Sequence, residues 1–190
     1  DFHQNGVIST LHNLSSRSLD EIERELRDYS KSAPIELILP SLYSELDGPA
    51  LKNIVKCLSK IKYLNHITVG LDRATKKEYI KAKEFFSNLN QSHSVLWNDS
   101  PKMKKLDKDF MALGIAPDQA GKGKNVWYCM GYTYSRNEAK SVALHDCDIM
   151  TYSRELLAKL VYPVANPHFN YEFCKGYYPR VRDGSLGGRV

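Results

Sequence analysis

Two aspartates separated by one residue follow an apolar stretch with the composition of a buried strand. The stretch is Ser141–Leu144, and after His145 come Asp146, Cys147 and Asp148. Two unpaired carboxylates are costly inside a sheet, but at the end of a strand both can reach one ligand. One can bind a hard divalent cation while the other holds a sugar hydroxyl or a metal-bound water, which would suit a diphosphate. A solvated turn or a helix N-cap would have the same sequence.

A segment rich in glycine and lysine precedes a predicted helix. In Gly121-Lys122-Gly123-Lys124 the glycines allow close backbone approach, and the lysines with the amino end of the helix offer positive charge to a phosphate. The segment is not a P-loop, because six residues separate Gly114 from Gly121 where a P-loop has four, and Gly123 follows Lys122 where a P-loop has Ser or Thr. A flexible basic surface loop is the alternative interpretation.

Two more acids, Glu45 and Asp72, follow predicted strands. A carboxylate there can accept both hydroxyls of a ribose, so each is a candidate for nucleotide binding. Glu45 could instead support the entry of a helix. Asp72 could lie in a turn or pair with Arg73. His145 is expected to pack or to hydrogen-bond through its ring, and Cys147 to fill space between the aspartates.

The elements that must position these side chains alternate between helix and strand. Hydrophobic spacing and the Ser18/Glu21 capping box predict a helix over 18–32, and Thr75 with Glu78 opens another. Strands are predicted at 35–39, 67–71, 95–97 and 141–144, and further helices after Asp47 and at 125–135 and 152–161. Pro40 is expected to end the first strand and Asp47 to cap the next helix.

This alternation predicts an α/β fold with a mostly parallel sheet and helices on both faces. Ligands are then expected beyond the carboxyl ends of the strands. Residues 98–124 carry weak periodicity and read as a loop-rich excursion. An amphipathic strand is predicted at 171–178, with stacking on a nucleotide as the alternative. Arg180, Arg182 and Arg189 form a basic group suited to phosphate or carboxylate, or are ordinary surface charge.

Length and composition fit one folded domain. The chain has 190 residues and a net charge of +5, which suits an anionic partner without distinguishing nucleic acid, phosphates and lipid headgroups. Its four cysteines are scattered, as expected for reduced thiols in a cytoplasmic protein. No apolar run approaches the roughly 20 residues needed to span a bilayer, and no signal peptide is recognised.

Five short stretches resemble, in order, the motifs of glucosyl-3-phosphoglycerate synthases and their close glycosyltransferase relatives. The stretches are 40–45, 121–123 with Trp127, 146–148, 175–180 and 187–190. The resemblance implies a GT-A (Rossmann-like) fold, a UDP-sugar donor, above all UDP-glucose, and Mg²⁺ or Mn²⁺ as the metal. It also implies transfer, with retention of configuration, to a small phosphorylated or carboxylated acceptor such as 3-phosphoglycerate.

Carried over by position, the donor residues implied by the resemblance come from three segments besides Asp146. Pro40, Leu42 and Glu45 would hold the uridine together with Asp72, and Lys122 would meet the diphosphate. The end of the second strand lacks the family's usual run of Asp, Ser and Thr, which puts the identity of base and sugar in question.

The remaining roles implied by the resemblance fall on the aspartate pair and the carboxyl end. Asp146 would bind the ribose or sugar of the donor, and Asp148 the metal. Gly188 and Arg189 would grip the phosphate and carboxylate of the acceptor. The family's catalytic region continues beyond this point with a metal-binding histidine, so residues 1–190 are expected to form a single nucleotide-sugar-binding domain at the amino-terminal part of a longer catalytic chain.

The sequence is thus interpreted as a metal-dependent glycosyltransferase in which Asp146, Asp148 and Lys122 carry the catalysis. The cation and Lys122 would stabilise negative charge on the UDP leaving group, with no protein nucleophile. The expected partners are the donor and the acceptor, without nucleic acid or membrane, and a homodimer is among the expected assemblies. Two alternatives stay open. One is a sugar nucleotidyltransferase, disfavoured because no glycine-rich, Arg-containing signature follows the first strand. The other is a non-catalytic phosphate- or RNA-binding module.

Overall fold

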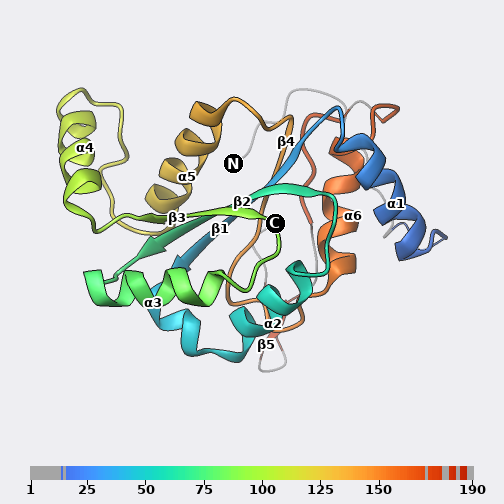
Figure 1. Ribbon diagram of the computed structural model, residues 1–190, viewed down its shortest axis with the longest axis horizontal. Coiled ribbons are helices and arrows are strands. Elements are labelled where there is room, and N and C mark those ends of the chain that lie inside the picture. The colour runs from blue at the N-terminus through green and yellow to red at the C-terminus, as the bar shows by residue number, and fades with distance from the viewer. Residues whose placement is uncertain (1–13, 15, 170, 177–179, 183–184, 188–190) are drawn as a thin grey trace.

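The computed structural model describes Leu14, residues 16–169 and 171–176, and the backbone of 180–182 and 185–187. These residues form a four-stranded parallel sheet in the order β3-β2-β1-β4 and a small antiparallel pair, β5 and β6 (Figure 1). In chain order the elements are α1 Leu19–Tyr29, β1 Ile35–Leu42, the 3-10 helix η1 Tyr43–Asp47, α2 Pro49–Leu58, β2 Leu64–Asp72, α3 Lys76–Phe86, β3 Ser92–Trp97, α4 Pro101–Ala112, α5 Lys122–Arg136, β4 Ser141–Leu144, α6 Arg154–Ala165, β5 Arg180–Arg182 and β6 Ser185–Gly187.

Both predicted capping boxes are present. Ser18 Oγ accepts the backbone N–H of Glu21, and the Glu21 carboxylate accepts the N–H of Ser18 at 3.0 Å, which starts α1. Thr75 and Glu78 make the same reciprocal bonds at the start of α3. Each box satisfies two backbone donors that the first turn of a helix leaves free, so the short polar motifs identify these helix starts from the sequence.

The two faces of the sheet differ in chemistry. Apolar side chains of β1 and β2 such as Leu37, Leu39, Ile67 and Val69 are fully buried in one core with residues of α1, α2, α3 and α6. The opposite face is covered by α5, which contacts β1 and β2 (Figure 1). The predicted fold class, a mostly parallel sheet with helices on both faces, is confirmed.

The face under α5 is rich in polar side chains. Glu36 of β1 lies opposite His66 of β2, and Thr68 lies opposite Ser94 of β3. Glu36, His66 and Thr68 are all buried. The ring nitrogens of His66 lie 2.9 and 3.1 Å from the hydroxyls of Ser92 and Ser94, and burial lowers the pKa of His66 to about 4. The imidazole is therefore neutral at physiological pH.

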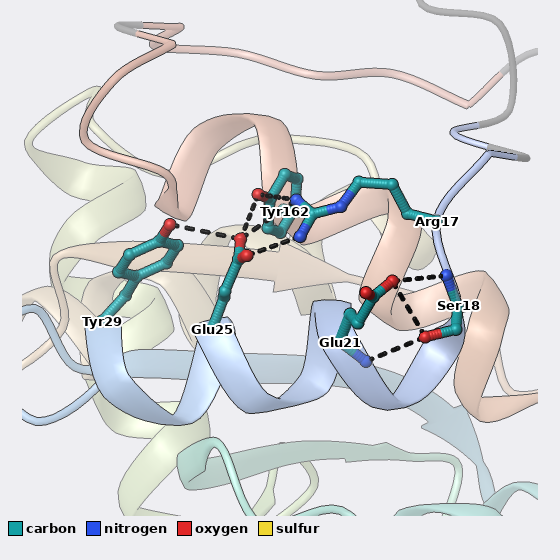
Figure 2. A network of polar contacts seen from close by, with 6 residues as sticks. All are labelled: Arg17, Ser18, Glu21, Glu25, Tyr29 and Tyr162. Atoms are coloured by element: carbon teal, nitrogen blue, oxygen red, sulfur yellow. Dashed lines mark hydrogen bonds and ion pairs between the residues drawn. The ribbon is translucent and has the colours of Figure 1, made fainter.

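A polar clasp joins α1 to α6 far from the carboxyl ends of the strands. Figure 2 shows Glu25 at its centre, accepting hydrogen bonds from the guanidinium of Arg17 and from the hydroxyls of Tyr29 and Tyr162. The Arg17 hydrogen bond, and next that from Tyr162, lower the pKa of Glu25 to about 2. The carboxylate is thus charged throughout the physiological range and ties the two helices together.

Strand β1 runs through Pro40, which was expected to end it. The carbonyl of Ile38 accepts from the N–H of His145 at 3.1 Å, so the backbone groups of Ile38 point toward β4. Pro40, two residues on, faces the same side, but β4 has already ended at Leu144. The missing N–H of proline therefore breaks no ladder bond.

The predicted cap of α2 is also wrong. Asp47 ends η1, and α2 starts at Pro49 after Gly48 with no side chain capping it. Proline at the first helical position lacks an N–H that would be unpaired in any case, so the helix starts without a side-chain acceptor.

The segment 98–124 contains a helix that the sequence analysis did not predict. Ser100 caps α4 by accepting the N–H of Met103 at 3.1 Å, and Pro101 takes the first position. None of the side chains of α4, all of which are described, is buried. The side of α4 that is half buried carries Met103, Asp107 and Phe110. A charged residue interrupts its apolar spacing, which is why the cap was the clearer indication of this helix.

Near the carboxyl end, residues 171–176 form no regular element, so the predicted strand at 171–178 is wrong over the part that is described. Residues 177 and 178 lie outside the described residues. Among the helices that are described, none combines the length and the hydropathy that crossing a bilayer requires.

Candidate functional site

A cavity of about 130 Å³ opens where β1 and β4 end and α5 begins. Its lining contains most of the residues predicted to bind the donor or the metal, namely Pro40, Leu42, Glu45, Lys122, Asp146 and Asp148. Ser41, Asn125 and Cys147 complete it. The carboxyl ends of parallel strands share one edge of the sheet, which is why segments about 100 residues apart in the chain meet here.

Lys122 and Asp146 form an ion pair across this cavity. The ammonium of Lys122 contacts Asp146 Oδ1, and the side chains are 55% and 43% exposed, so both remain accessible to a ligand. Lys122 is the first residue of α5, and Gly121 before it has φ +142°, a conformation that favours glycine. No described side chain caps this amino end. Its free N–H groups and the lysine together offer positive charge to a phosphate.

Glu45 takes the helix-entry role that was predicted as its alternative, and its contact with a nucleotide stays a prediction. Its Oε2 accepts the N–H of Leu42 at 2.9 Å and the hydroxyl of Ser41 at 3.1 Å, so the carboxylate supports the entry of η1. Both bonds use the same oxygen, which leaves Oε1 to accept from a ligand in the cavity. Ser41 is 2% exposed and fixes the orientation of the carboxylate.

Asp148 lies in the cavity lining beyond Cys147. In the described parts of the chain, no three side chains of His, Cys, Asp or Glu gather as a metal site. Mg²⁺ and similar hard cations are commonly held by one or two carboxylates, with phosphate oxygens of the substrate and water as the other ligands. The residues present therefore fit a cation shared with a diphosphate and do not form a closed protein cage.

The structure does not bring Asp72 into the cavity lining. Its Oδ1 accepts from Asn98 Nδ2 at 2.7 Å. Burial raises the pKa of Asp72, and the Asn98 and Asn125 amides act against this rise. Arg73 has φ +56°, as in a turn, and no ion pair joins it to Asp72 within the described residues. Asp72 thus lies outside the cavity lining, bonded to Asn98.

His145 and Cys147, which adjoin the two aspartates in the sequence, pack as predicted. His145 Nδ1 lies 3.1 Å from the hydroxyl of Tyr152, and burial lowers the pKa of the imidazole to about 4. The Cys147 side chain is 2% exposed, and burial raises the pKa of its thiol. Neither residue is available as a charged or reactive group.

Two residues of the cavity lining, Ser41 and Asn125, were not among the residues predicted from the sequence. Ser41 lies inside the motif 40–45, and its hydroxyl could have been assigned to the nearby acid. Asn125 follows Lys122 by three residues, a spacing that puts both on one side of a helix. That spacing was the signal available for Asn125. The predicted acceptor residues Gly188 and Arg189 lie outside the described residues.

A second cavity, of about 390 Å³, lies where β2 and β3 end. Arg73, Trp97, Asp99 and Lys104 contribute to its lining. Asp99 is already engaged, since it accepts the N–H of Ala74 at 3.0 Å and lies 3.8 Å from the Lys104 ammonium. None of the predicted site residues lines this cavity.

No protein-family model matches the chain. Two curated relatives match all of it: glucosyl-3-phosphoglycerate synthase of Persephonella marina, 48% identical over 190 residues, and that of Methanococcoides burtonii, 36% identical over 193 residues. In each case the match covers 47% of the relative, so the chain spans about half the length of the curated relatives it matches.

A solved structure also matches, that of glucosyl-3-phosphoglycerate synthase from Mycobacterium tuberculosis in complex with Mn²⁺, UDP and glucosyl-3-phosphoglycerate. The TM-score is 0.49 and the sequence identity 16%, over 87% of this chain and 47% of the other.

Proposed function

Since its resemblance to glucosyl-3-phosphoglycerate synthases extends over the whole chain, we propose that this chain is the donor-binding part of a glycosyltransferase of that kind. The reaction would move glucose from UDP-glucose to 3-phosphoglycerate or a similar small anion, with retention of configuration. One observation carries the proposal: a single cavity collects Lys122, Asp146, Asp148 and Glu45 at the carboxyl edge of the sheet.

The donor would lie along this cavity with its diphosphate at the start of α5. Lys122 and the free N–H groups of the first turn supply positive charge there. Glu45 Oε1 can accept ribose hydroxyls, and the backbone and side chains of Pro40 and Leu42 form the wall next to the base. Direct contact between Asp72 and the uridine stays a prediction.

Asp148 would hold the divalent cation, Mg²⁺ or Mn²⁺, together with oxygens of the diphosphate. When bound, such a cation supplies Lewis-acid stabilisation of the charge that grows on the leaving diphosphate. Lys122 adds to that stabilisation, because an ammonium beside the leaving group is preorganised for the developing charge.

Asp146 would change partner when the donor binds. In the structure its carboxylate is paired with Lys122. A diphosphate that attracts the ammonium frees this carboxylate, which can then accept a hydroxyl of the ribose or the sugar. The ion pair thus holds both side chains at the cavity before the donor binds. Breaking it costs little free energy, because both side chains are half exposed.

The test is a thermal-shift and calorimetric screen of the chain with UDP-glucose, UDP and GDP-mannose, each with and without Mn²⁺. A ligand at 100 times its Kd stabilises the native state by about 2.7 kcal/mol, so binding raises the melting temperature measurably. Stabilisation by UDP-glucose that needs Mn²⁺ supports the proposal. No stabilisation by any UDP ligand contradicts it.

The matched variants for this screen are Asp148→Asn and Asp47→Asn. Asp47 is an exposed acid outside the cavity, so its change should leave metal-dependent binding intact. Binding that ignores Mn²⁺ and falls steeply with salt would instead favour the non-catalytic phosphate- or RNA-binding module. The homodimer and the cytoplasmic location expected from the sequence stay predictions.

A further inference from the structure

Asn125 has no role in the donor contacts proposed above, although it lines the same cavity as Lys122. Its side chain is buried, with the residue only 3% exposed. Its backbone N–H donates to the carbonyl of Gly121 at 3.1 Å, so it closes the first turn of α5. Because residues three apart lie on the same side of a helix, Lys122 and Asn125 are neighbours on the α5 surface.

Both ends of the Asn125 amide are fixed. Nδ2 donates to the carbonyl of Gly70 in β2 at 2.9 Å, and this bond is buried. Oδ1 accepts from the Cys129 thiol at 3.4 Å. The Asn125 amide also acts to lower the pKa of Asp72, the last residue of β2. The amide therefore links the amino end of α5 to the carboxyl end of β2.

Gly70 makes this link very short. A Cβ atom on Gly70 would overlap Oδ1 of Asn125 and lie 2.5 Å from Sγ of Cys129. Any side chain at this position of β2 would hold α5 farther from the sheet. The side chains of Asn125 and Cys129 thus pack directly on the backbone of β2, and Asn125 lies within one turn of Lys122.

Farther along α5, the interface with the sheet is incompletely bonded. Both carboxylate oxygens of Glu36 and the hydroxyls of Thr68 and Thr133 are buried without a hydrogen-bond partner among the described residues. Arg136 approaches Glu36 at 3.6 Å as an ion pair. Farther along α5, the Tyr132 hydroxyl lies 2.8 Å from that of Ser94 in β3, so a directional contact also holds the far half of the helix. Among the described residues, the bond from Asn125 to Gly70 is the directional contact between α5 and the sheet that lies nearest to Lys122.

We propose that Asn125 is a positioning residue, which anchors the first turn of α5 to Gly70 and so holds the Lys122 ammonium where it meets Asp146 and a bound diphosphate. Asn125 acts through Lys122 and needs no contact of its own with the ligand. This inference rests on the proposed function, since the diphosphate of UDP is taken as the group that Lys122 meets.

The test measures the affinities of UDP and uridine, in the presence of Mn²⁺, by calorimetry for four proteins: the wild type, Asn125→Ala, Lys122→Ala and the double variant. We expect Asn125→Ala to lower the affinity for UDP about tenfold and the affinity for uridine less than twofold. In the Lys122→Ala background, removal of Asn125 should change the UDP affinity less than twofold, because the group it positions is gone. Equal weakening of both ligands, or the same UDP loss in both backgrounds, would overturn the proposal.

Thr133→Val is the control, because Thr133 is buried on the same helix but away from its first turn. It should leave both affinities within twofold of the wild type. If Asn125→Ala does not fold, Asn125→Ser replaces it, since a smaller polar side chain cannot reach the Gly70 carbonyl but avoids an apolar group at the site.

Hydrogen exchange of the unliganded chain separates failure of this inference from failure of the proposed function. Loss of the anchor should speed exchange at the amides of residues 125–129 and leave those of residues 132–136 unchanged. If the wild type binds no UDP, the proposed function fails. Hydrogen exchange alone then decides whether Asn125 anchors the first turn of α5. Unchanged exchange at residues 125–129 in the Asn125 variant would then overturn it.

Discussion

In the proposed function, Lys122 exchanges its ion pair with Asp146 for the diphosphate of the donor. Its ammonium pairs with Asp146 across an open cavity, where an exposed ion pair contributes about 0 to 1 kcal/mol to stability. The residue can therefore change without cost to the fold, and its loss should be felt in binding.

We expect Lys122→Ala to lower the affinity for UDP roughly 10- to 100-fold, because a hydrogen bond to a charged group is worth about 1.5–3 kcal/mol. Uridine should lose less than twofold, because it carries no diphosphate. Titration calorimetry with both ligands measures this difference. Lys104→Ala, at the second cavity, is the matched control and should change neither affinity. Equal losses for UDP and uridine would place Lys122 away from the phosphates.

For single residues, the sequence allowed a prediction where the interacting residues lie close together in the chain. The Asp146 and Asp148 pair, the motif around Glu45 and both capping boxes depend on residues within three or four positions of each other. The spacing from Lys122 could have placed Asn125 on the same side of the helix, but its bond to Gly70 spans 55 residues of chain. No local pattern encodes such a contact.

Between elements, the clasp around Glu25 makes stability depend on pH. Its folded-state pKa of about 2 lies below the usual carboxyl value near 4.5. A lowered folded pKa stabilises the protein at pH above the unfolded value, and that contribution is lost as the pH falls from about 4.5 toward 2. Arg17, Tyr29 and Tyr162 are the partners whose bonds are lost.

We therefore expect Glu25→Gln to lower the melting temperature at pH 7 and to reduce its decline between about pH 5 and pH 2. The measurement is thermal unfolding of both proteins across this range by circular dichroism. Asp20→Asn, an exposed acid on the same helix, serves as the control and should leave the wild-type profile in place. If the melting temperatures of wild type and Glu25→Gln fell in parallel with pH, the clasp would not contribute to the pH dependence of stability.

The contact between α5 and β2 predicts opposite effects of two glycine substitutions. Gly70→Ala should destabilise the chain by about 1–3 kcal/mol or more, because the added Cβ overlaps Asn125 and crowds Cys129. Gly131→Ala, within α5 and with open space around the added Cβ, should stabilise by up to about 1 kcal/mol. Urea denaturation measures both. If Gly70→Ala left the free energy of unfolding unchanged, α5 and β2 would separate easily at this point.

The elements themselves were largely predictable, for identifiable reasons. Strands that bury one face in the common core and helices with capping boxes carry strong patterns. Three errors came from context that the pattern lacks: Pro40 sits where a neighbouring strand has ended, Asp47 ends a 3-10 helix, and α4 has no buried side. In each case, tertiary surroundings decided the outcome.

For the molecule as a whole, the sequence predicted the four strands of the parallel sheet and the order of its helices apart from α4. It also predicted the edge of the sheet at which the proposed site lies. It could not supply the acceptor side. Gly188 and Arg189 lie outside the described residues, and the chain spans about half the length of its curated relatives. The assignment of these residues still rests on resemblance, and kinetics can test it.

In an active enzyme that contains this chain, Arg189→Ala should raise the acceptor KM at least about tenfold and leave the affinity for UDP nearly unchanged. A guanidinium can hold a phosphate or carboxylate through two parallel charge-assisted bonds, each stronger than a neutral hydrogen bond. Initial rates over a range of acceptor concentrations, together with UDP titration, measure both effects. Unchanged acceptor kinetics, or equal losses for donor and acceptor, would remove Arg189 from the acceptor site.

The attachment of α4 has a consequence for how this protein can change over evolutionary time. The helix buries no side chain and is joined to α5 through Asp107, which bonds Lys124 and Tyr128, and through the edge of Phe110 against Trp127. Most other side chains of α4 are exposed, so most mutations there are close to neutral for folding. The helix can therefore accumulate sequence differences and new surface chemistry beside the first turn of α5, which Lys124 and Asp107 join to it.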